Sequence, residues 1–191
     1  IAPSLIGVGL FGFSLSYEGT YTNILNMLDL GGITLLASAR KEGEPFVIGG
    51  GPSAFNPEPV AEFFDAFLLG DGEEAILEIA DAVLEGKRTG ASRGEILLKL
   101  SKIPGMYVPS FFDVEYKEDG TVKAVIPLVE GYGKVVKRTI PDMNSLPLPT
   151  KPVVPFMETV HDRVSVEISR GCTRGCRFCQ AGMIYRPVRE R

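Results

Sequence analysis

The sequence has few of the residues on which several common classes of protein depend. Of its 191 residues, three are cysteine, one is histidine and none is tryptophan. An odd and small number of cysteines in a chain of this size argues against a disulfide scaffold. The formal net charge is −4, so the composition gives no signal for binding the phosphates of a nucleic acid.

Long apolar stretches are also missing. No run of the sequence approaches the ~20 apolar residues that a membrane-spanning helix needs, so no membrane partner is expected. Residues 1–11 are largely apolar but lack the basic residues that open a signal peptide, and the first residue is not methionine. Unpaired cysteines suit a reducing compartment, and together these features predict a cytoplasmic protein.

The cysteines are concentrated near the end of the chain. They are Cys172, Cys176 and Cys179, with the spacing C-x-x-x-C-x-x-C. Thiolates so close together repel one another unless they converge on a soft metal, and cysteine is the usual ligand of iron–sulfur clusters. Three ligands would leave one iron of a cubane cluster without a protein ligand. Such an open position is where chemistry can occur, as it does at a catalytic zinc.

The flanking residues support a metal-binding loop. Residues 163–169 alternate between apolar and polar, which predicts a strand before the first cysteine. Gly171 and Gly175 allow the loop to fold tightly and to bring backbone N–H groups towards the sulfurs. Phe178 stands directly before the third cysteine.

This cysteine spacing, with an aromatic residue before the last cysteine, resembles the radical S-adenosylmethionine (SAM) superfamily. Residues 170–182 are similar to one branch, which carries an N-terminal domain of the cobalamin-binding type. The resemblance implies that the three cysteines hold a [4Fe-4S] cluster and that reductive cleavage of SAM starts radical chemistry on an unknown substrate. It also implies that Phe178 and Gly182 lie on the SAM side, and that a reductant such as flavodoxin or ferredoxin supplies electrons.

Two other interpretations remain open from the sequence. The three cysteines could bind structural zinc with His161 as the fourth ligand, although zinc sites usually show paired C-x-x-C groups. The chain could instead be a cobalamin-binding or nucleotide-binding module in which the cysteines play no part. The identity of the metal separates the zinc interpretation from the iron–sulfur one.

The first part of the chain alternates strand and helix patterns. Strands are predicted at residues 10–16, 46–48 and 66–69, and helices at residues 20–30, 57–64 and 70–84. This alternation is typical of a parallel sheet with helices on both faces, so we predict an α/β, partial doubly wound, Rossmann-like domain of the cobalamin-binding type over residues 1–104. The resemblance indicates that this domain is incomplete at its N-terminus.

Polar and small residues follow the predicted strands. Ser14, Gly49, Gly50 and Gly70 would lie at the carboxyl ends of these strands, where α/β sheets bind ligands. In the similar family, such residues line the channel for the nucleotide tail of cobalamin, which makes cobalamin a further candidate cofactor. The histidine loop that ligates cobalt in that family is not found before Ser14. Tight turns between strands and helices explain the glycines equally well.

The rest of the chain is predicted to contain two further parts. Residues 92–103 form a helix with a Ser92–Glu95 capping box. Residues 105–160 form a small antiparallel β unit, with strands at 112–116, 121–127 and 134–140, and a proline-rich linker. Residues 161–191 form the start of a radical SAM domain, with the first strand and loop of a truncated TIM-type barrel. The chain is therefore interpreted as an internal fragment of a longer enzyme, and is expected to be inactive alone.

Overall fold

The structure is a computed structural model. It describes residues 8–148, 150–151, 156–158, 160, 163 and 165–191. The chain divides into two compact units, Ile1–Thr139 and Ile140–Arg191. Among the residues described, no helix is both long enough and apolar enough to span a bilayer.

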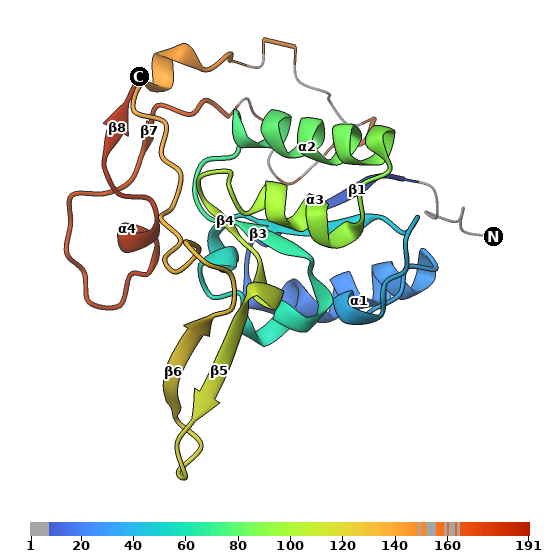
Figure 1. The fold of residues 1–191 in the computed structure, drawn as a ribbon. Helices are drawn as coiled ribbons and strands as arrows, with labels where there is room; N and C mark the ends of the chain where they lie inside the picture. The colour runs from blue at the N-terminus through green and yellow to red at the C-terminus, as the bar shows by residue number, and fades with distance from the viewer. Residues whose placement is uncertain (1–7, 149, 152–155, 159, 161–162, 164) are drawn as a thin grey trace. The chain divides into compact units, whose positions relative to one another are not determined.

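The first unit is built on a four-stranded sheet with the strand order β1-β2-β3-β4 (Figure 1). Strands β1 (Leu10–Ser14), β2 (Phe46–Gly50) and β3 (Ala66–Leu68) are parallel, and β4 (Met106–Tyr107) is antiparallel to β3. The predicted mostly parallel α/β sheet is therefore confirmed.

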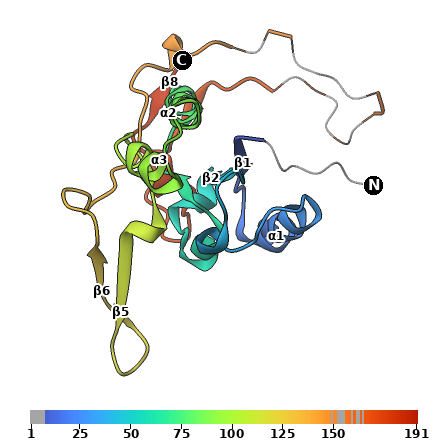
Figure 2. The ribbon, with the colours of Figure 1, turned by 45° about the vertical axis from the view of Figure 1, so that its right-hand side comes forward.

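Helices cover both faces of this sheet, as Figure 2 shows. Helix α1 (Tyr21–Leu30) packs on one face, and α2 (Ala75–Thr89) and α3 (Arg93–Leu100) pack on the other. Side chains alternate along β2, so that Phe46 and Ile48 face α2 and α3 while Val47 faces the α1 side. Two hydrophobic cores result, one on each face.

Short segments of 3-10 helix lie between the longer elements of the chain. They are η1 (Glu18–Thr20), η2 (Ala37–Ala39), η3 (Pro52–Phe55), η4 (Glu58–Phe63), η5 (Pro109–Phe111) and η6 (Met143–Ser145). The helix predicted over residues 57–64 is thus the 3-10 helix η4. The prolines of η3, η4 and η5 set the backbone for a turn without supporting a longer α-helix.

The long helix α2 buries one stripe of small and apolar residues. Its buried positions are Ala75, Ile79, Val83 and Gly86, while Ile76 is 49% exposed. A side chain at position 86 would collide with Ile96 of α3, which explains how the two helices approach so closely.

The predicted capping box at the start of α3 is confirmed. The backbone N–H of Glu95 donates to the Ser92 hydroxyl at 3.3 Å, and the backbone N–H of Ser92 donates to a Glu95 carboxylate oxygen at 2.8 Å. Two of the N–H groups that a helix start leaves unpaired are satisfied in this way.

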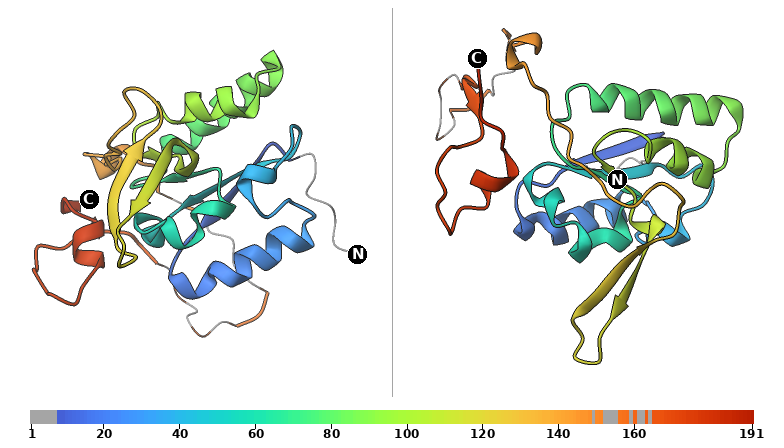
Figure 3. Two further views of the ribbon diagram at one scale, coloured as in Figure 1. Left: turned by 60° about the horizontal axis from the view of Figure 1, so that its bottom comes forward. Right: turned by 60° about the vertical axis from the view of Figure 1, so that its left-hand side comes forward.

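A β-hairpin projects from the first unit (Figure 3). It consists of β5 (Phe112–Tyr116) and β6 (Val122–Pro127), which pair in antiparallel fashion as the sequence predicts. The strand expected at residues 134–140 was wrong. That segment makes a single parallel bridge, between Gly70 and Arg138. Because one bridge supplies too few ladder hydrogen bonds, no strand forms there.

The second unit contains little regular structure. Strands β7 (Ser169–Arg170) and β8 (Arg189–Glu190) pair in antiparallel fashion, and α4 (Ala181–Ile184) lies between them in the sequence. Of the strand predicted over residues 163–169, only Ser169 is in a strand among the residues described, because β8 offers just two partner residues. The described strands form no closed barrel, so the barrel start stays a prediction.

The predicted domain limits at residues 104 and 160 also stay predictions. Strand β4 lies just beyond residue 104 in the sequence, yet it pairs with β3 in the main sheet. The hairpin β5–β6 follows it within the same compact unit.

Candidate functional site

The three cysteines lie on the loop between β7 and α4. The loop starts at Gly171, whose φ of +88° is in the left-handed region that favours glycine. A side chain there would also come within 2.7 Å of the carbonyl oxygen of Tyr185 and 3.0 Å of that of Pro187. Glycine at position 171 therefore lets the chain approach its own returning backbone at the base of the loop.

All three thiols are free, and they are open to solvent to different degrees. Cys172 and Cys176 are exposed, and Cys179 is half-buried. The backbone N–H of Arg174 donates to the Cys172 sulfur at 3.4 Å, and the N–H of Cys179 donates to the carbonyl oxygen of Cys176 at 3.1 Å. Hydrogen bonds of the first kind are among those that tune a thiolate-bound cluster.

The sulfurs are not gathered at one point in this conformation. Within the described ranges, no three cysteine, histidine, aspartate or glutamate side chains are grouped closely enough to hold a metal ion. The chemistry of the donors nevertheless suits an iron–sulfur cluster, because three free thiols lie on one short loop and one of them already accepts an N–H bond. Ligand loops commonly become ordered only as the metal binds.

Arg186, which follows α4, forms hydrogen bonds to the first half of the cysteine loop. Arg186 donates from Nη2 to the carbonyl oxygen of Arg174 at 2.9 Å and from Nε to that of Cys172 at 3.3 Å. Its one sequence signal is its position, just after the short helix that follows the cysteines.

Phe178 and Gly182, predicted on the SAM side, lie on either side of Cys179 in the sequence. The Phe178 side chain is 91% exposed, so its ring is open to a ligand. Gly182 is buried, and a Cβ there would lie 3.8 Å from the Cys179 sulfur, an ordinary contact distance. Their predicted roles stay predictions. His161, the zinc alternative's fourth ligand, lies outside the described residues.

The residues predicted at the ends of the strands have mixed surroundings. Ser14 and Gly50 are register partners at the ends of β1 and β2. A side chain at Gly49 would come within 2.7 Å of the Phe67 ring, and one at Gly70, whose φ is +106°, would overlap the backbone of Arg138. Packing therefore accounts for Gly49 and Gly70. A Cβ at Gly50 would lie 4.0 Å from the carbonyl oxygen of Leu68, an ordinary contact distance, and its predicted role in a ligand channel stays a prediction.

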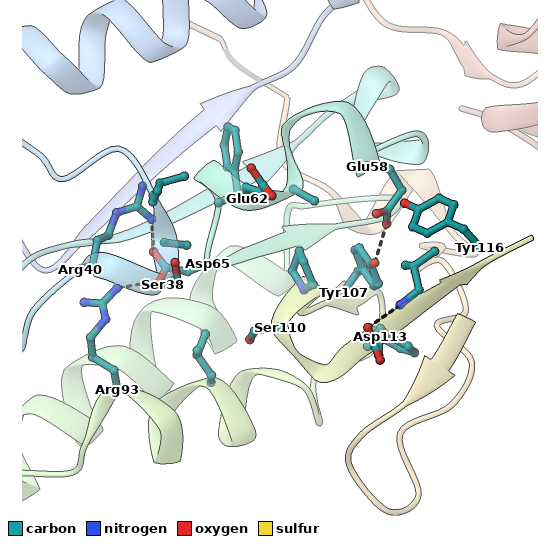
Figure 4. A pocket seen from close by; sticks show the side chains of 18 residues that line it. Ser38, Arg40, Glu58, Glu62, Asp65, Arg93, Tyr107, Ser110, Asp113 and Tyr116 are labelled. Atoms are coloured by element: carbon teal, nitrogen blue, oxygen red, sulfur yellow. Dashed lines mark hydrogen bonds and ion pairs between the residues drawn. The ribbon is translucent and has the colours of Figure 1, made fainter. Parts of the chain in front are cut away.

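The structure also contains a cavity that the sequence did not reveal. It has a volume of about 740 Å³ and lies within the first unit, between η2, η4, α3 and the start of the hairpin (Figure 4). Its charged and aromatic lining residues are Arg40, Glu58, Glu62, Phe64, Asp65, Arg93, Tyr107, Phe112, Asp113 and Tyr116. Because they come from segments far apart in the sequence, no local motif could have identified them.

One end of this cavity is built on a buried ionic triad. Asp65 accepts hydrogen bonds from Arg40 Nη1 and Arg93 Nη2, each at 2.7 Å, and from the backbone N–H of Val47 at 2.7 Å. Burial lowers the pKa of Arg40, and the Asp65 charge opposes that shift. Arg40 also donates to three backbone carbonyl oxygens, including that of Phe63. This end of the cavity is therefore rigid and internally satisfied.

The other end carries a tyrosine bonded to a carboxylate. The Tyr107 hydroxyl donates to Glu58 Oε1 at 2.6 Å. Burial, and then the bond to Glu58, raise the pKa of Tyr107. The phenol consequently remains protonated and continues to donate throughout the physiological pH range.

Comparison with known proteins assigns a family to the region that contains the sheet. Residues 4–109, more than half of the chain, match the family described as radical SAM proteins, N-terminal. The uncharacterized protein MJ0966 of Methanocaldococcus jannaschii is 29% identical over 180 residues, which cover 93% of this chain and 31% of that protein. The chain thus spans about a third of this relative's length.

Proposed function

This chain belongs to the radical SAM proteins, and from that membership we propose that Cys172, Cys176 and Cys179 hold a [4Fe-4S] cluster in an enzyme that cleaves SAM. One observation carries the proposal. The three cysteines have the spacing C-x-x-x-C-x-x-C in a chain whose preceding half matches the N-terminal region of this family.

The residues of this chain would bind and position the cofactors. When bound, the cluster supplies one electron to SAM and so starts radical chemistry on a substrate. The thiolates of the three cysteines would be its ligands, and the N–H of Arg174 would help to stabilise the charge on the Cys172 sulfur. The exposed ring of Phe178 could cover an apolar face of SAM, and Gly182 leaves space beside Cys179.

The proposal includes a reductant such as flavodoxin or ferredoxin as the electron donor. It does not include cobalamin, because packing explains Gly49 and Gly70 without a ligand. Structural zinc remains the competing interpretation of the same cysteines, since thiolates also suit that metal.

A cleavage assay tests the proposed activity. The longer enzyme proposed to contain this chain is reconstituted anaerobically with iron and sulfide, and SAM and dithionite are added. We expect 5′-deoxyadenosine to form, and we expect none with Cys176→Ala. Thr173→Ala serves as a matched control in the same loop, because that side chain is not a metal ligand. A loaded cluster that leaves SAM intact would give the cysteines an electron-transfer role instead.

A further inference from the structure

The cavity of the first unit has two ends of different chemistry, which Figure 4 shows side by side. Arg40, Asp65 and Arg93 form one end, and Glu58, Tyr107, Asp113 and Tyr116 gather at the other. Its volume of about 740 Å³ falls within the range of small-molecule sites. All of its lining residues lie between positions 36 and 116, within the first unit.

The charges that line the cavity are unbalanced. Both guanidinium groups are paired with Asp65. Glu58, Glu62 and Asp113 also line the cavity, and in the part of the chain that the structure describes they form no ion pair. Within the described residues, Glu58 accepts one side-chain hydrogen bond, from the Tyr107 hydroxyl. Asp113 accepts one, from the backbone N–H of Val114, and Glu62 accepts none. The cavity therefore offers a ligand several negatively charged acceptors.

Aromatic rings stand next to these carboxylates. The ring centroids of Tyr107 and Phe112 are 5.2 Å apart, at an interplanar angle of 35°. Tyr116, on the same strand as Phe112, is 63% exposed. Aromatic faces attract cations and also cover apolar groups, so they complement the neighbouring carboxylates. The Tyr107–Glu58 hydrogen bond holds one ring and one carboxylate in a fixed relationship.

We propose that this cavity binds a small organic cation, an amine or guanidine carried on an aromatic or apolar body. The cationic group would lie beside the carboxylates that line the cavity, which are Glu58, Glu62 and Asp113, and the apolar body would pack on Tyr107, Phe112 and Tyr116. Such a ligand would donate N–H hydrogen bonds to the carboxylate oxygens, whereas all three carboxylates would repel an anion. The paired arginines at the other end are already satisfied by Asp65 and by backbone carbonyls.

Two probes of nearly the same shape test the proposal. Tyramine carries an ammonium group where tyrosol carries a hydroxyl, and both have the same phenol body. Binding to the 191-residue chain is measured by isothermal titration calorimetry at low salt. We expect tyramine to bind about tenfold more tightly than tyrosol. We also expect its affinity to fall as salt is raised, since exposed charges are screened.

Substitutions locate the binding. Glu62→Gln and Asp113→Asn should each weaken tyramine binding about threefold, because each removes one exposed charge. Asp81→Asn, on the exposed side of α2 and outside the cavity lining, is the matched control and should leave the affinity unchanged. Thermal unfolding checks that each variant is folded. The proposal is overturned if tyramine does not bind, if tyrosol binds equally well, or if the two cavity variants bind like the control.

Discussion

The guanidinium of Arg186 donates from Nη2 to the carbonyl oxygen of Arg174 at 2.9 Å, across twelve residues of sequence. The same side chain donates to the carbonyl oxygen of Cys172. Arg186, which follows α4, therefore holds the backbone at both Cys172 and Arg174 in the first half of the cysteine loop. The arrangement orders a segment whose side chains are otherwise mostly exposed.

Replacing this arginine should loosen the loop. Arg186→Gln removes the hydrogen bonds to the carbonyl oxygens of Cys172 and Arg174, which are worth about 1 kcal/mol each. Hydrogen exchange of the amides between residues 172 and 176 should therefore accelerate by about fivefold or more. Mass spectrometry of deuterium uptake measures this directly in the metal-free protein.

Arg177→Gln is the matched control for that change. Arg177 lies in the same loop and is exposed, and its side chain makes no hydrogen bond to any residue that the structure describes. Its exchange should match that of the parent chain. Equal exchange in the two variants would show that Arg186 does not order the loop.

Gly70 is predicted to be essential for packing. Gly70→Ala would place a side chain at a φ of +106° and against the backbone of Arg138. We expect the free energy of unfolding to fall by about 2 kcal/mol or more. Urea denaturation measures the loss.

Gly12→Ala provides the comparison, because a side chain at Gly12 meets nothing within 4 Å. The change in its unfolding free energy should stay within about 1 kcal/mol. If both variants were equally stable, the packing explanation of Gly70 would fail and a ligand role would become the better account.

The buried triad makes Asp65 a sensitive position. Asp65→Asn would leave Arg40 and Arg93 without the carboxylate that both contact at 2.7 Å. An uncompensated buried charge costs about 3–5 kcal/mol of unfolding free energy. Glu62→Gln changes a nearby exposed carboxylate and should cost less than about 0.5 kcal/mol. A small loss for Asp65→Asn, measured by urea denaturation, would contradict a stabilising role for the triad.

The capping box predicts a pH dependence of stability. Hydrogen bonds from the Ser92 hydroxyl and backbone lower the pKa of Glu95 from its ordinary value of 4.5. The ionised carboxylate therefore stabilises the fold above the unfolded pKa, and this contribution is lost as the pH falls through the lower, folded pKa.

Glu95→Ala should consequently be less stable than the parent chain at pH 7, and the difference should shrink towards pH 3. Thermal unfolding midpoints at the two pH values measure this. Asp81→Asn, a carboxylate substitution outside the box, corrects for the general effect of removing one charge. A constant difference across the range would show that ionised Glu95 does not stabilise the helix start.

The sequence predicted those parts of the fold that depend on local patterns. The strands around Phe46 and Ala66, the capping box at Ser92 and the hairpin before Pro127 were all identified, because their signals lie within a few neighbouring residues. The strand predicted at residues 134–140 was wrong, because an alternating pattern alone does not provide a strand to pair with. In α2, Ala75 and Gly86 are buried although such small residues give little apolar signal in the sequence.

The cysteine loop and the cavity likewise differ in how much of each the sequence reveals. Cys172, Cys176 and Cys179 could be found from the sequence because their spacing carries the chemistry. The contacts of Arg186 and the cavity around Tyr107 depend on segments brought together by folding. No pattern in the sequence relates Glu58 to Tyr107, forty-nine residues later, yet they share a hydrogen bond of 2.6 Å.

The metal content of the anaerobically reconstituted protein tests the central claim most directly. Iron, sulfide and zinc are assayed in the parent chain and in three single variants, Cys172→Ala, Cys176→Ala and Cys179→Ala. We predict about four irons and four sulfides per chain in the parent, and loss of both in each variant. Zinc without iron, or iron that persists in all three variants, would contradict the assignment of the cysteines to an iron–sulfur cluster.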